Sequence, residues 1–472
     1  MNMPIHRARY VALGSLVLAG TVLLAEGTRF SDYMPLATST SPAIPVINED
    51  EPITFGNPDF HQQSIADRTT QLTANKPNSG SFDMITVNET GPHKGRYLFT
   101  VFETGNSGVQ RHDLETGVTE TIWQSPAAGR YVSFDACYWT PWGTLITAEE
   151  SWSTLGDAGH PQPYGRLFEL KNPIEAPGIL NPVTGLSNAG ADFVHQNIVP
   201  RTSHEGIQFD KAGNMYFIDE LNGGNVYRFT STADLGKVKG GQADYFAAGQ
   251  TFVLRVGDGS VPNATGAFSW VPFTNANGLP LPGALTITDS NGVTSVDARN
   301  TTNLPAFKGT DYQRPEDMQI QTLSGVDYLY MTTTTTHEVY RIDLKNNTIS
   351  VFANRNTINL STGAAVGTAL NSPDNLGIDH DGNIYIVEDR NGGSDDDIWF
   401  ANDLNKDGDL LDQDEGIGRW ASNGTGGSEF TGLYFDPTDK RRGWVNIQHP
   451  SSANDRTIEF TIPKQLSCST RD

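Results

Sequence analysis

Neighbouring carboxylates are the first feature of this sequence that could do chemistry. Glu149 and Glu150 follow the apolar pair 145–146, and Arg314 stands two residues before Glu316. Adjacent carboxylates repel each other, and a divalent or trivalent cation relieves that repulsion. An arginine beside such a site can bind phosphate through its two-pronged guanidinium. Each segment, taken alone, is equally well a solvated strand end or a surface turn with a local ion pair.

Three further segments have the same character. Glu205 follows His204 directly before an apolar run, so the pair could supply a metal ligand and an acid–base group. Asp374 and Asn375 offer the hard oxygens that calcium prefers, although a turn capped by Asp and Asn is the plainer interpretation. These two are followed by Glu388-Asp389. Glu429 precedes one apolar run, and His449 follows the next.

A different acidic segment has the spacing of a calcium-binding loop. Oxygen side chains fall at loop positions 1, 3 and 5, Gly408 stands at position 6, and an acid stands at position 12, where Asp replaces the usual Glu. We predict a structural calcium here, against the alternative of an acidic solvated loop. The predicted loop residues are Asp403, Asn405, Asp407, Asp409 and Asp414.

The elements that must position these residues are short strands. An apolar run with period 2, a turn containing Gly, and a second apolar run recur about six times, and the turn D-x-x-G-N-x-Y appears at Asp210–Tyr216 and Asp379–Tyr385. Such turns are typical of hairpins. The pattern predicts an all-β protein, a β-propeller of about six blades over 61–472 with insertions near 231–310 and 394–425. A β-sandwich is the competing fold.

Composition and charge restrict the function. The 472 residues include 48 Gly and 26 Pro, which suits many short strands joined by turns. Acids outnumber bases 55 to 32, giving a net charge of −23, and this excludes a basic surface for nucleic acid. The acidity suits cation binding or simple solubility. The two cysteines, Cys137 and Cys468, could pair but do not make a disulfide scaffold.

The N-terminal segment predicts export. Arg7 and Arg9 precede an apolar run over 10–25, which is the pattern of a signal peptide or an N-terminal anchor over 1–27. A buried core helix is the alternative. Residues 28–60 are rich in Ser, Thr and Pro and predict a linker or strap. We therefore expect a periplasmic, cell-surface or extracellular protein with no further membrane segment.

Five motifs in order carry a resemblance to a known family. The strings TPWGT…EE, HE, RPED, SPDN and EFTG…VNIQHP lie between about residue 80 and residue 460. Together they resemble the PhoX-type alkaline phosphatases. The resemblance implies a six-bladed propeller, exported through a bacterial envelope, that hydrolyses phosphoesters with an iron–calcium cluster at the mouth of its central channel.

The resemblance also implies roles for residues of this chain. Arg314 would orient phosphate, His449 would bind phosphate or shuttle a proton, and Glu205 would serve catalysis and metal binding. Asn375, Glu388 and Asp389 are weaker candidates. The implied metal ligands or their supports are Glu149, Glu150, Glu205, Glu316, Asp374 and Glu429.

The sequence departs from the family at one position. The family has an iron-binding cysteine shortly before TPWG, where Asp135 stands here, and Cys137 lies two residues later on the same face of the expected strand. Either Cys137 takes over as ligand or Asp135 makes an all-oxygen site that favours calcium over thiolate-bound iron. Tyr138 and Trp139 stand where the family has glycines and would narrow the site. A divergent substrate and a loss of activity are therefore both alternatives.

The function that this sequence supports is a metal-dependent hydrolase of small-molecule phosphoesters, with calcium and iron as the expected cofactors. Two other classes stay open. One is a calcium-dependent propeller lactonase or esterase, and the other is a non-catalytic calcium-binding envelope protein. No Ser-His-Asp arrangement competes with a metal mechanism.

Overall fold

The computed structural model describes residues 34–40, 48–152, 163–175, 192–289, 291–390 and 396–463. The predicted signal or anchor at 1–27 and Cys468 lie outside these ranges, so both expectations stay predictions. Among the helices that are described, none is long and apolar enough to cross a membrane.

Strands dominate the described residues, and they form six antiparallel runs of four. In each run the first strand lies at the centre of the molecule and the last at its edge. This is a β-propeller, and the fold class predicted from the period-2 pattern is confirmed. The runs are β3 (Phe82–Val87), β4 (Tyr97–Phe102), β5 (Gly108–Asp113), β6 (Val118–Gln124); β7 (Phe134–Trp139), β8 (Leu145–Glu149), β9 (Leu167–Leu170), β10 (Phe193–His195); β11 (Ile207–Phe209), β12 (Asn214–Ile218), β14 (Val226–Ser231), β15 (Gly249–Val256); β20 (Pro315–Leu323), β21 (Val326–Thr333), β22 (Glu338–Asp343), β23 (Thr348–Ala353); β26 (Pro373–Ile378), β27 (Ile384–Glu388), β28 (Asp397–Asn402), β29 (Gly416–Asn423); and β30 (Glu429–Phe435), β31 (Arg442–Gln448), β32 (Arg456–Thr461), β2 (His61–Asp67).

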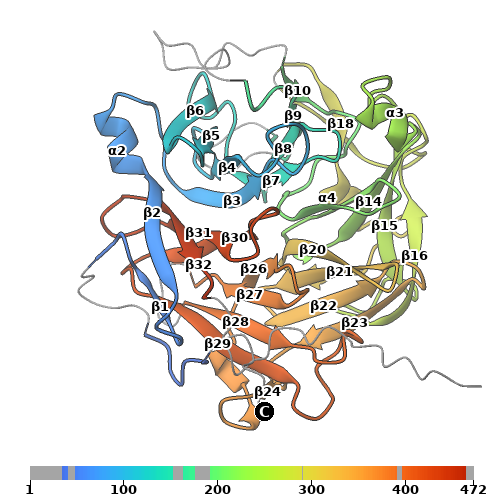
Figure 1. Cartoon of the computed structure of the whole chain (residues 1–472). Coiled ribbons are helices and arrows are strands. Elements are labelled where there is room, and N and C mark those ends of the chain that lie inside the picture. The colour runs from blue at the N-terminus through green and yellow to red at the C-terminus, as the bar shows by residue number, and fades with distance from the viewer. Residues whose placement is uncertain are drawn as a thin grey trace, which may run out of the picture.

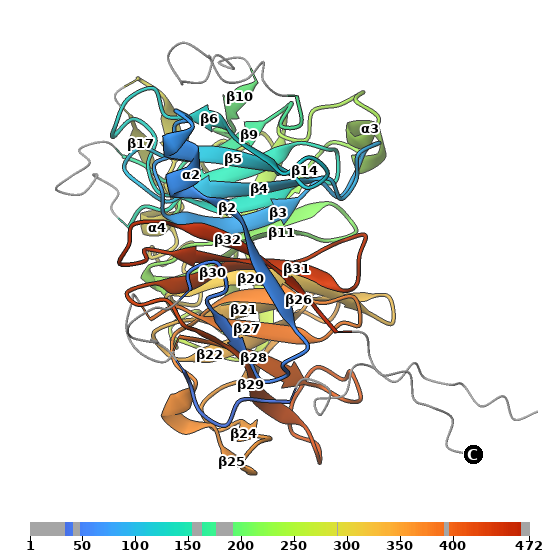
Figure 2. The same ribbon diagram turned by 60° about the vertical axis from the view of Figure 1, so that its left-hand side comes forward.

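The six innermost strands form a closed ring. Each packs against the next in the order β3, β7, β11, β20, β26, β30 and back to β3 (Figure 1). The last blade is completed from the other end of the described chain, because β2 pairs with β32 with His61 opposite Thr461. Figure 2 shows β2 running beside β32 and β31. This closure holds the two ends of the propeller together and keeps the ring from opening.

The longest insertion joins two blades. β16 (Gly266–Pro272) pairs with β15 and also with β23, so the third and fourth blades share one nine-stranded sheet. The remaining small elements lie at the edges of the blades or between them. They are α2 (Arg68–Thr73), α3 (Leu235–Lys239), α4 (Ala298–Thr301), η1 (Gly367–Ala369), β1 (Ile53–Phe55), β13 (Asn222–Gly224), β17 (Thr286–Thr288), β18 (Thr294–Val296), β19 (Tyr312–Gln313), β24 (Ile358–Asn359) and β25 (Ala364–Ala365).

The two D-x-x-G-N-x-Y turns are hairpins that set strand register. In the third blade, Asp210 accepts hydrogen bonds from the Asn214 amide at 2.8 Å and the Tyr216 hydroxyl at 2.9 Å. Gly213 between them has φ +86°, a conformation that favours glycine. The same contacts recur at Asp379 in the fifth blade. Each turn joins the innermost strand of a blade to the second strand. It therefore sets the register of the two strands, and with it the residues that lie at the end of the blade opposite the turn.

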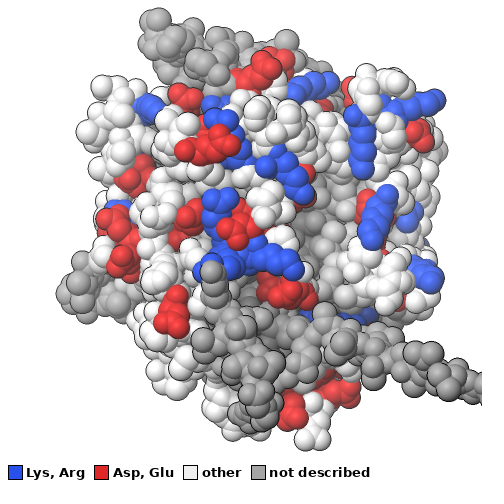
Figure 3. All heavy atoms as spheres, in the orientation of Figure 1, with Lys and Arg blue, Asp and Glu red and all other residues white. Residues whose placement is uncertain are grey.

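The net negative charge does not form a separate patch on the face seen in Figure 1. Figure 3 shows acidic and basic side chains interspersed over that face. Many of the acidic side chains are instead buried near the propeller axis.

Candidate metal centre

A cavity of about 250 Å³ at one end of the channel is lined mainly by carboxylates. The other lining side chains include Arg314, His449, Trp152 and Gln448. The carboxylates come from every blade. They are Asp83, Glu103, Asp135, Glu150, Glu205, Glu220, Glu316, Asp374, Asp389 and Glu429.

The innermost strands supply six of these carboxylates at equivalent positions. Asp83, Asp135, Glu316 and Asp374 are each the second residue of their strand. In all four strands the register shifts by one residue there, as between Phe134 and Cys137 of β7, so the carboxylate lies in a β-bulge. Bulges turn side chains out of the regular alternation and are common beside active sites. The remaining two are Glu205 just before β11 and Glu429 at the start of β30.

The second strands supply the other four. Glu103, Glu150 and Asp389 each follow the last residue of β4, β8 and β27, and Glu220 follows β12 by two residues. Because the first two strands of a blade are antiparallel, the end of the second lies beside the start of the first. The blade topology therefore gathers both sets at one mouth of the channel.

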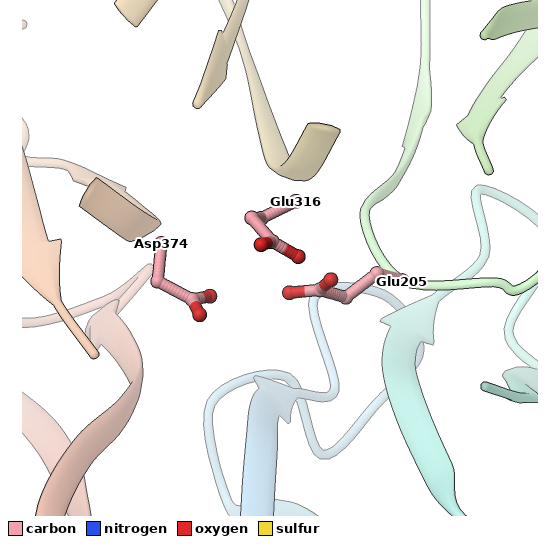
Figure 4. A group of neighbouring side chains, drawn as sticks. All are labelled: Glu205, Glu316 and Asp374. Atoms are coloured by element: carbon pink, nitrogen blue, oxygen red, sulfur yellow. The ribbon is translucent and has the colours of Figure 1, made fainter. Parts of the chain in front are cut away.

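Three carboxylates form the centre of this cluster. Glu205, Glu316 and Asp374 each place an oxygen within 4.8 Å of the others. Figure 4 shows the three side chains pointing toward one another from three separate segments of the chain. All three are buried. Such a convergence of hard oxygen atoms is the arrangement that binds calcium and similar cations.

Burial and mutual repulsion raise the pKa values of these groups. Burial raises the pKa of Glu205 well above its usual range, and the neighbouring Glu316 raises it further. The pKa of Asp374 is raised in the same way, by burial and then by Glu316. Burial, with Asp389 beside it, raises the pKa of Glu429 to about 12. Without cations, so many carboxylates cannot all ionise in this space.

The unsatisfied oxygens fit a cation cluster. Asp135 Oδ1, Glu316 Oε2 and Glu429 Oε2 are buried and have no hydrogen-bond partner. Leaving a buried polar atom unpaired is costly, so these atoms need a ligand that the protein itself does not provide. All donors in the cluster are oxygens, which suits hard cations.

Arg314 and His449 are placed differently at the cavity. The Arg314 guanidinium donates to Glu220 Oε1, with Nε at 3.1 Å, and Nε lies 3.2 Å from Glu316 Oε1. It stacks 4.9 Å from the Trp152 ring. His449 is half exposed, with Nε2 3.5 Å from Glu429 Oε1. Arg314 thus reaches into the carboxylate cluster, whereas His449 lies at its solvent side.

Two predicted ligands lie elsewhere. Glu149 is fully buried in an ion pair with Arg166 at 2.5 Å, while the next residue, Glu150, lines the cavity. Consecutive residues at a strand end point in opposite directions, so one site does not take both. Cys137 lines a second cavity of about 330 Å³, and burial raises the pKa of its thiol. The expectation that Glu149 and Cys137 belong to the site is corrected.

The weaker candidates divide in the same manner. Asp389 lines the cavity, but Glu388 is buried and accepts from the Asn371 amide at 2.7 Å and Trp399 Nε1 at 2.9 Å. Asn375 accepts from the Gly432 amide at 2.8 Å and ties β26 to β30. His204 is buried against Phe217 and is no partner for Glu205 at the cavity.

Three cavity carboxylates were not predicted from the sequence. Asp83, Glu103 and Glu220 line the cavity but belong to no motif singled out above. A signal for Asp83 exists, because Ser stands two residues before the carboxylate at Ser81, Ser133 and Ser372, each with positive φ. Glu103 and Glu220 follow apolar runs, as Glu150 does, but acids after apolar runs are too common to be diagnostic.

The predicted calcium loop lies outside the cavity, between β28 and β29. Its position-12 residue, Asp414, is exposed, whereas the next residue, Glu415, is buried. The ligands of this loop, Asp414 among them, therefore stay a prediction.

A propeller with a buried carboxylate cluster and an arginine at its channel mouth has the ligand set and the cationic group that a metal-dependent hydrolase needs. The family model described as "Alkaline phosphatase PhoX" matches residues 136–451. The chain belongs to the PhoX alkaline phosphatase family. It is a metal-dependent phosphoester hydrolase, as the five motifs predicted.

The likeness to a solved PhoX structure supports the fold. The Pseudomonas fluorescens PhoX structure in complex with vanadate, a transition state analogue, matches with a TM-score of 0.58 and 16% identity, covering 91% of this chain and 97% of that one. A streptogramin B lyase structure matches with a TM-score of 0.40 and 12% identity, over 86% of this chain and 98% of that one. No curated protein sequence matches this one.

Proposed function

We propose that the cavity at the channel mouth binds a cluster of hard cations, calcium among them, through oxygen ligands alone, and that it hydrolyses small-molecule phosphate monoesters. The observation that carries this proposal is the convergence of Glu205, Glu316 and Asp374 within 4.8 Å. Cations bound there would supply a Lewis acid that neutralises the charge of the phosphoryl oxygens.

The carboxylates divide into three groups by their surroundings. Glu205, Glu316 and Asp374 form the centre and would hold a shared cation. Asp135 and Glu429, each with an unpaired buried oxygen, would extend the cluster toward β7 and β30. The outer members would complete the coordination or fix the orientation of the inner ligands by hydrogen bonds. They are Asp83, Glu103, Glu150, Glu220 and Asp389.

Arg314 would bind the substrate phosphate. Its Nε and Nη2 donate to Glu220, and its Nε lies beside Glu316, so the guanidinium is already oriented at the cavity before substrate arrives, and phosphate would bind by its Nη1 side or by displacing Glu220. A preorganised arginine can bind two non-bridging oxygens at once. Trp152 stacks on the same guanidinium and restricts its motion.

His449 would move a proton at the solvent side of the cavity. Its Nε2 faces Glu429, and half of its side chain is exposed. A histidine there can give a proton to the leaving alcohol as it departs into solvent.

The ligand set bears on which metals bind. Asp135 presents an oxygen to the cavity at the position where the family resemblance implies an iron-binding thiolate, and Cys137 faces a different cavity. Oxygen ligands favour calcium, and any iron here would bind without sulfur. We further propose that the chain is exported, which rests on the basic and apolar pattern of residues 7–25. Mass spectrometry of the protein from its native host would test this by locating the mature N-terminus.

The deciding experiment is hydrolysis of p-nitrophenyl phosphate by purified protein at alkaline pH, before and after chelation and after adding back calcium, iron or both. We expect turnover to vanish on chelation and to return with calcium present. Glu316→Gln should stay inactive under every condition. If well-folded, calcium-loaded protein leaves the phosphomonoester intact but opens a sugar lactone, the lactonase alternative replaces this proposal.

A further inference from the structure

The loop between β28 and β29 is built around one buried, half-satisfied carboxylate. Asp403 is only 7% exposed. Its Oδ2 accepts a hydrogen bond from the Gly408 amide at 2.9 Å, across the turn of the loop. Its Oδ1 is buried and has no partner. A carboxylate held by one oxygen at the loop turn presents the other to the loop interior, where it needs a ligand.

The backbone wraps around that interior. Lys406 has φ +58° and Gly408 φ +86°, so the chain turns sharply at positions 4 and 6 of the loop. The positive φ favours glycine at position 408, and a Cβ there would lie 2.1 Å from the Arg341 guanidinium carbon, so Arg341 would have to move. The Lys406 ammonium points away from the loop centre, because it donates to Gly382 O at 3.1 Å and Asn383 Oδ1 at 3.2 Å.

Further oxygens surround the same interior. Glu415 Oε1 accepts from the Leu404 amide at 2.9 Å, so this buried carboxylate closes the loop from its far end. The Asn405 amide nitrogen lies between two carboxylates, 3.1 Å from Asp407 Oδ2 and 2.7 Å from Asp412 Oδ2. A positive group is therefore favoured between these two carboxylates. Rotating the Asn405 side-chain amide by half a turn would put its oxygen in place of its nitrogen, and that oxygen could bind a cation.

We propose that this loop binds one calcium ion through Asp403, Asn405, Asp407 and Glu415, with Glu415 rather than Asp414 as the closing carboxylate. Side-chain oxygens at alternate positions, a glycine at the sharp turn and an acid at the end are the features of calcium loops. Asp414 is exposed and contributes its carbonyl to Asn402 instead.

The ion would join two blades. Leu410 of the loop is buried in a core cluster with Tyr330 of β21 and Ile384 of β27. Gly408 packs against Arg341 of β22, and Lys406 reaches the β26–β27 turn. In Figure 1, β22 and β28 lie in neighbouring blades. Calcium would hold the loop in the conformation that makes these contacts, so it would stabilise the fourth and fifth blades against each other.

The first test is the calcium content of the whole protein after equilibrium dialysis, with Asp403→Asn, Glu415→Gln and Asp414→Asn compared with the wild type. We expect the first two variants to bind one calcium ion fewer per chain. Asp414→Asn removes the same charge from the same loop and should bind as much as the wild type. Equal calcium in all four proteins, or a loss in Asp414→Asn alone, would overturn the proposal. All four proteins keep the same channel site, so the difference in calcium content between them reports only on the loop. A channel site that binds no calcium would therefore not be mistaken for a loop that binds none.

A second test needs no variant. Leu411 is 87% exposed, so chymotrypsin can cleave after it when the loop opens. At a calcium concentration ten times the Kd, the opened fraction and the cleavage rate should fall by about tenfold, while magnesium at the same concentration should have little effect. Equal cleavage rates in calcium, magnesium and chelator would show that the loop binds no calcium.

Discussion

Asp135 and Cys137 lie two residues apart on one strand, yet they face two different cavities. Asp135 opens to the acidic cavity at the channel mouth. Cys137 opens to the second cavity, toward the opposite end of the channel, which is lined by side chains such as Met84, Tyr138, Gln319 and Leu433 from the same ring of innermost strands. One strand therefore serves a charged site and a largely uncharged one in succession.

The difference shows that sharing a face of a strand is a weak guide to sharing a site. Two residues of a strand span about 6.6 Å along its axis. The ligands of a cation lie about 2.3–2.6 Å from it, so a side chain displaced along the strand by two residues is too far away to bind the same cation. The bulge between Phe134 and Cys137 separates the two side chains further. Depth along the channel, rather than the strand face, decides which residues can bind one cluster.

The largest expected effect is the difference in activity between the variants Asp135→Asn and Cys137→Ser. Asp135→Asn should lower kcat/KM for a phosphomonoester by about 100-fold or more, because it weakens a ligand with an unpaired buried oxygen. Cys137→Ser should retain the activity and the metal content of the wild type. Both are measured by steady-state kinetics and elemental analysis of the purified proteins. Iron or activity lost from the serine variant alone would mean that the thiol moves into the mouth.

Arg314→Ala should have the next largest effect. The guanidinium is the cationic group that reaches into the carboxylate cluster, so its loss should lower kcat/KM by about 100-fold, or roughly 2.7 kcal/mol. Arg314→Lys keeps the charge but not the fork and should recover only part of the activity. The melting temperature of the calcium-loaded protein should change little. Wild-type turnover in a folded Arg314→Ala protein would exclude its role in phosphate binding.

Much of the fold could be predicted because local patterns encode it. The period-2 runs and the turns at Asp210 and Asp379 specify hairpins, and repeated hairpins of this kind predict a propeller. The closure of the last blade could not be predicted. It pairs β2 with β32, which lie at opposite ends of the described chain. The sequence of a seven-residue strand does not indicate which distant strand it pairs with.

The site could be predicted to the level of strand ends but not of single side chains. At Glu149-Glu150 and Glu388-Asp389 the sequence locates the end of a strand, and the second residue of each pair lines the cavity while the first is held in the blade. Which member faces the channel depends on a one-residue bulge in the partner strand. The position of a bulge depends on packing between blades, which a single sequence does not display.

Metal removal should reveal the repulsion at the mouth as a pH dependence of stability. Burial and neighbouring carboxylates raise the folded-state pKa of Glu429 from 4.5 to about 12 and raise the pKa values of Glu205 and Asp374 as well. The folded state therefore binds more protons than the unfolded state in this range, so the stability of the metal-free protein falls as pH rises. We expect a melting temperature at least about 5 °C lower at pH 8 than at pH 5 in chelator, and a smaller difference in calcium. A higher melting temperature at pH 8 in chelator would contradict the repulsion.

The smallest expected effect concerns the second cavity, beside Cys137. Burial raises the pKa of the Cys137 thiol, and its Sγ donates only a long contact to Phe99 O at 3.8 Å. Because the thiolate is the reactive form, iodoacetamide should modify Cys137 slowly at pH 8 in the folded protein and rapidly after denaturation. Peptide mapping separates this residue from Cys468. If the two cavities are independent, chelating the metals should leave the rate at Cys137 nearly unchanged. A marked acceleration on chelation would show that the mouth and the second cavity respond to the same ions. Asp135 and Cys137 would then differ in position but not in their dependence on the metals.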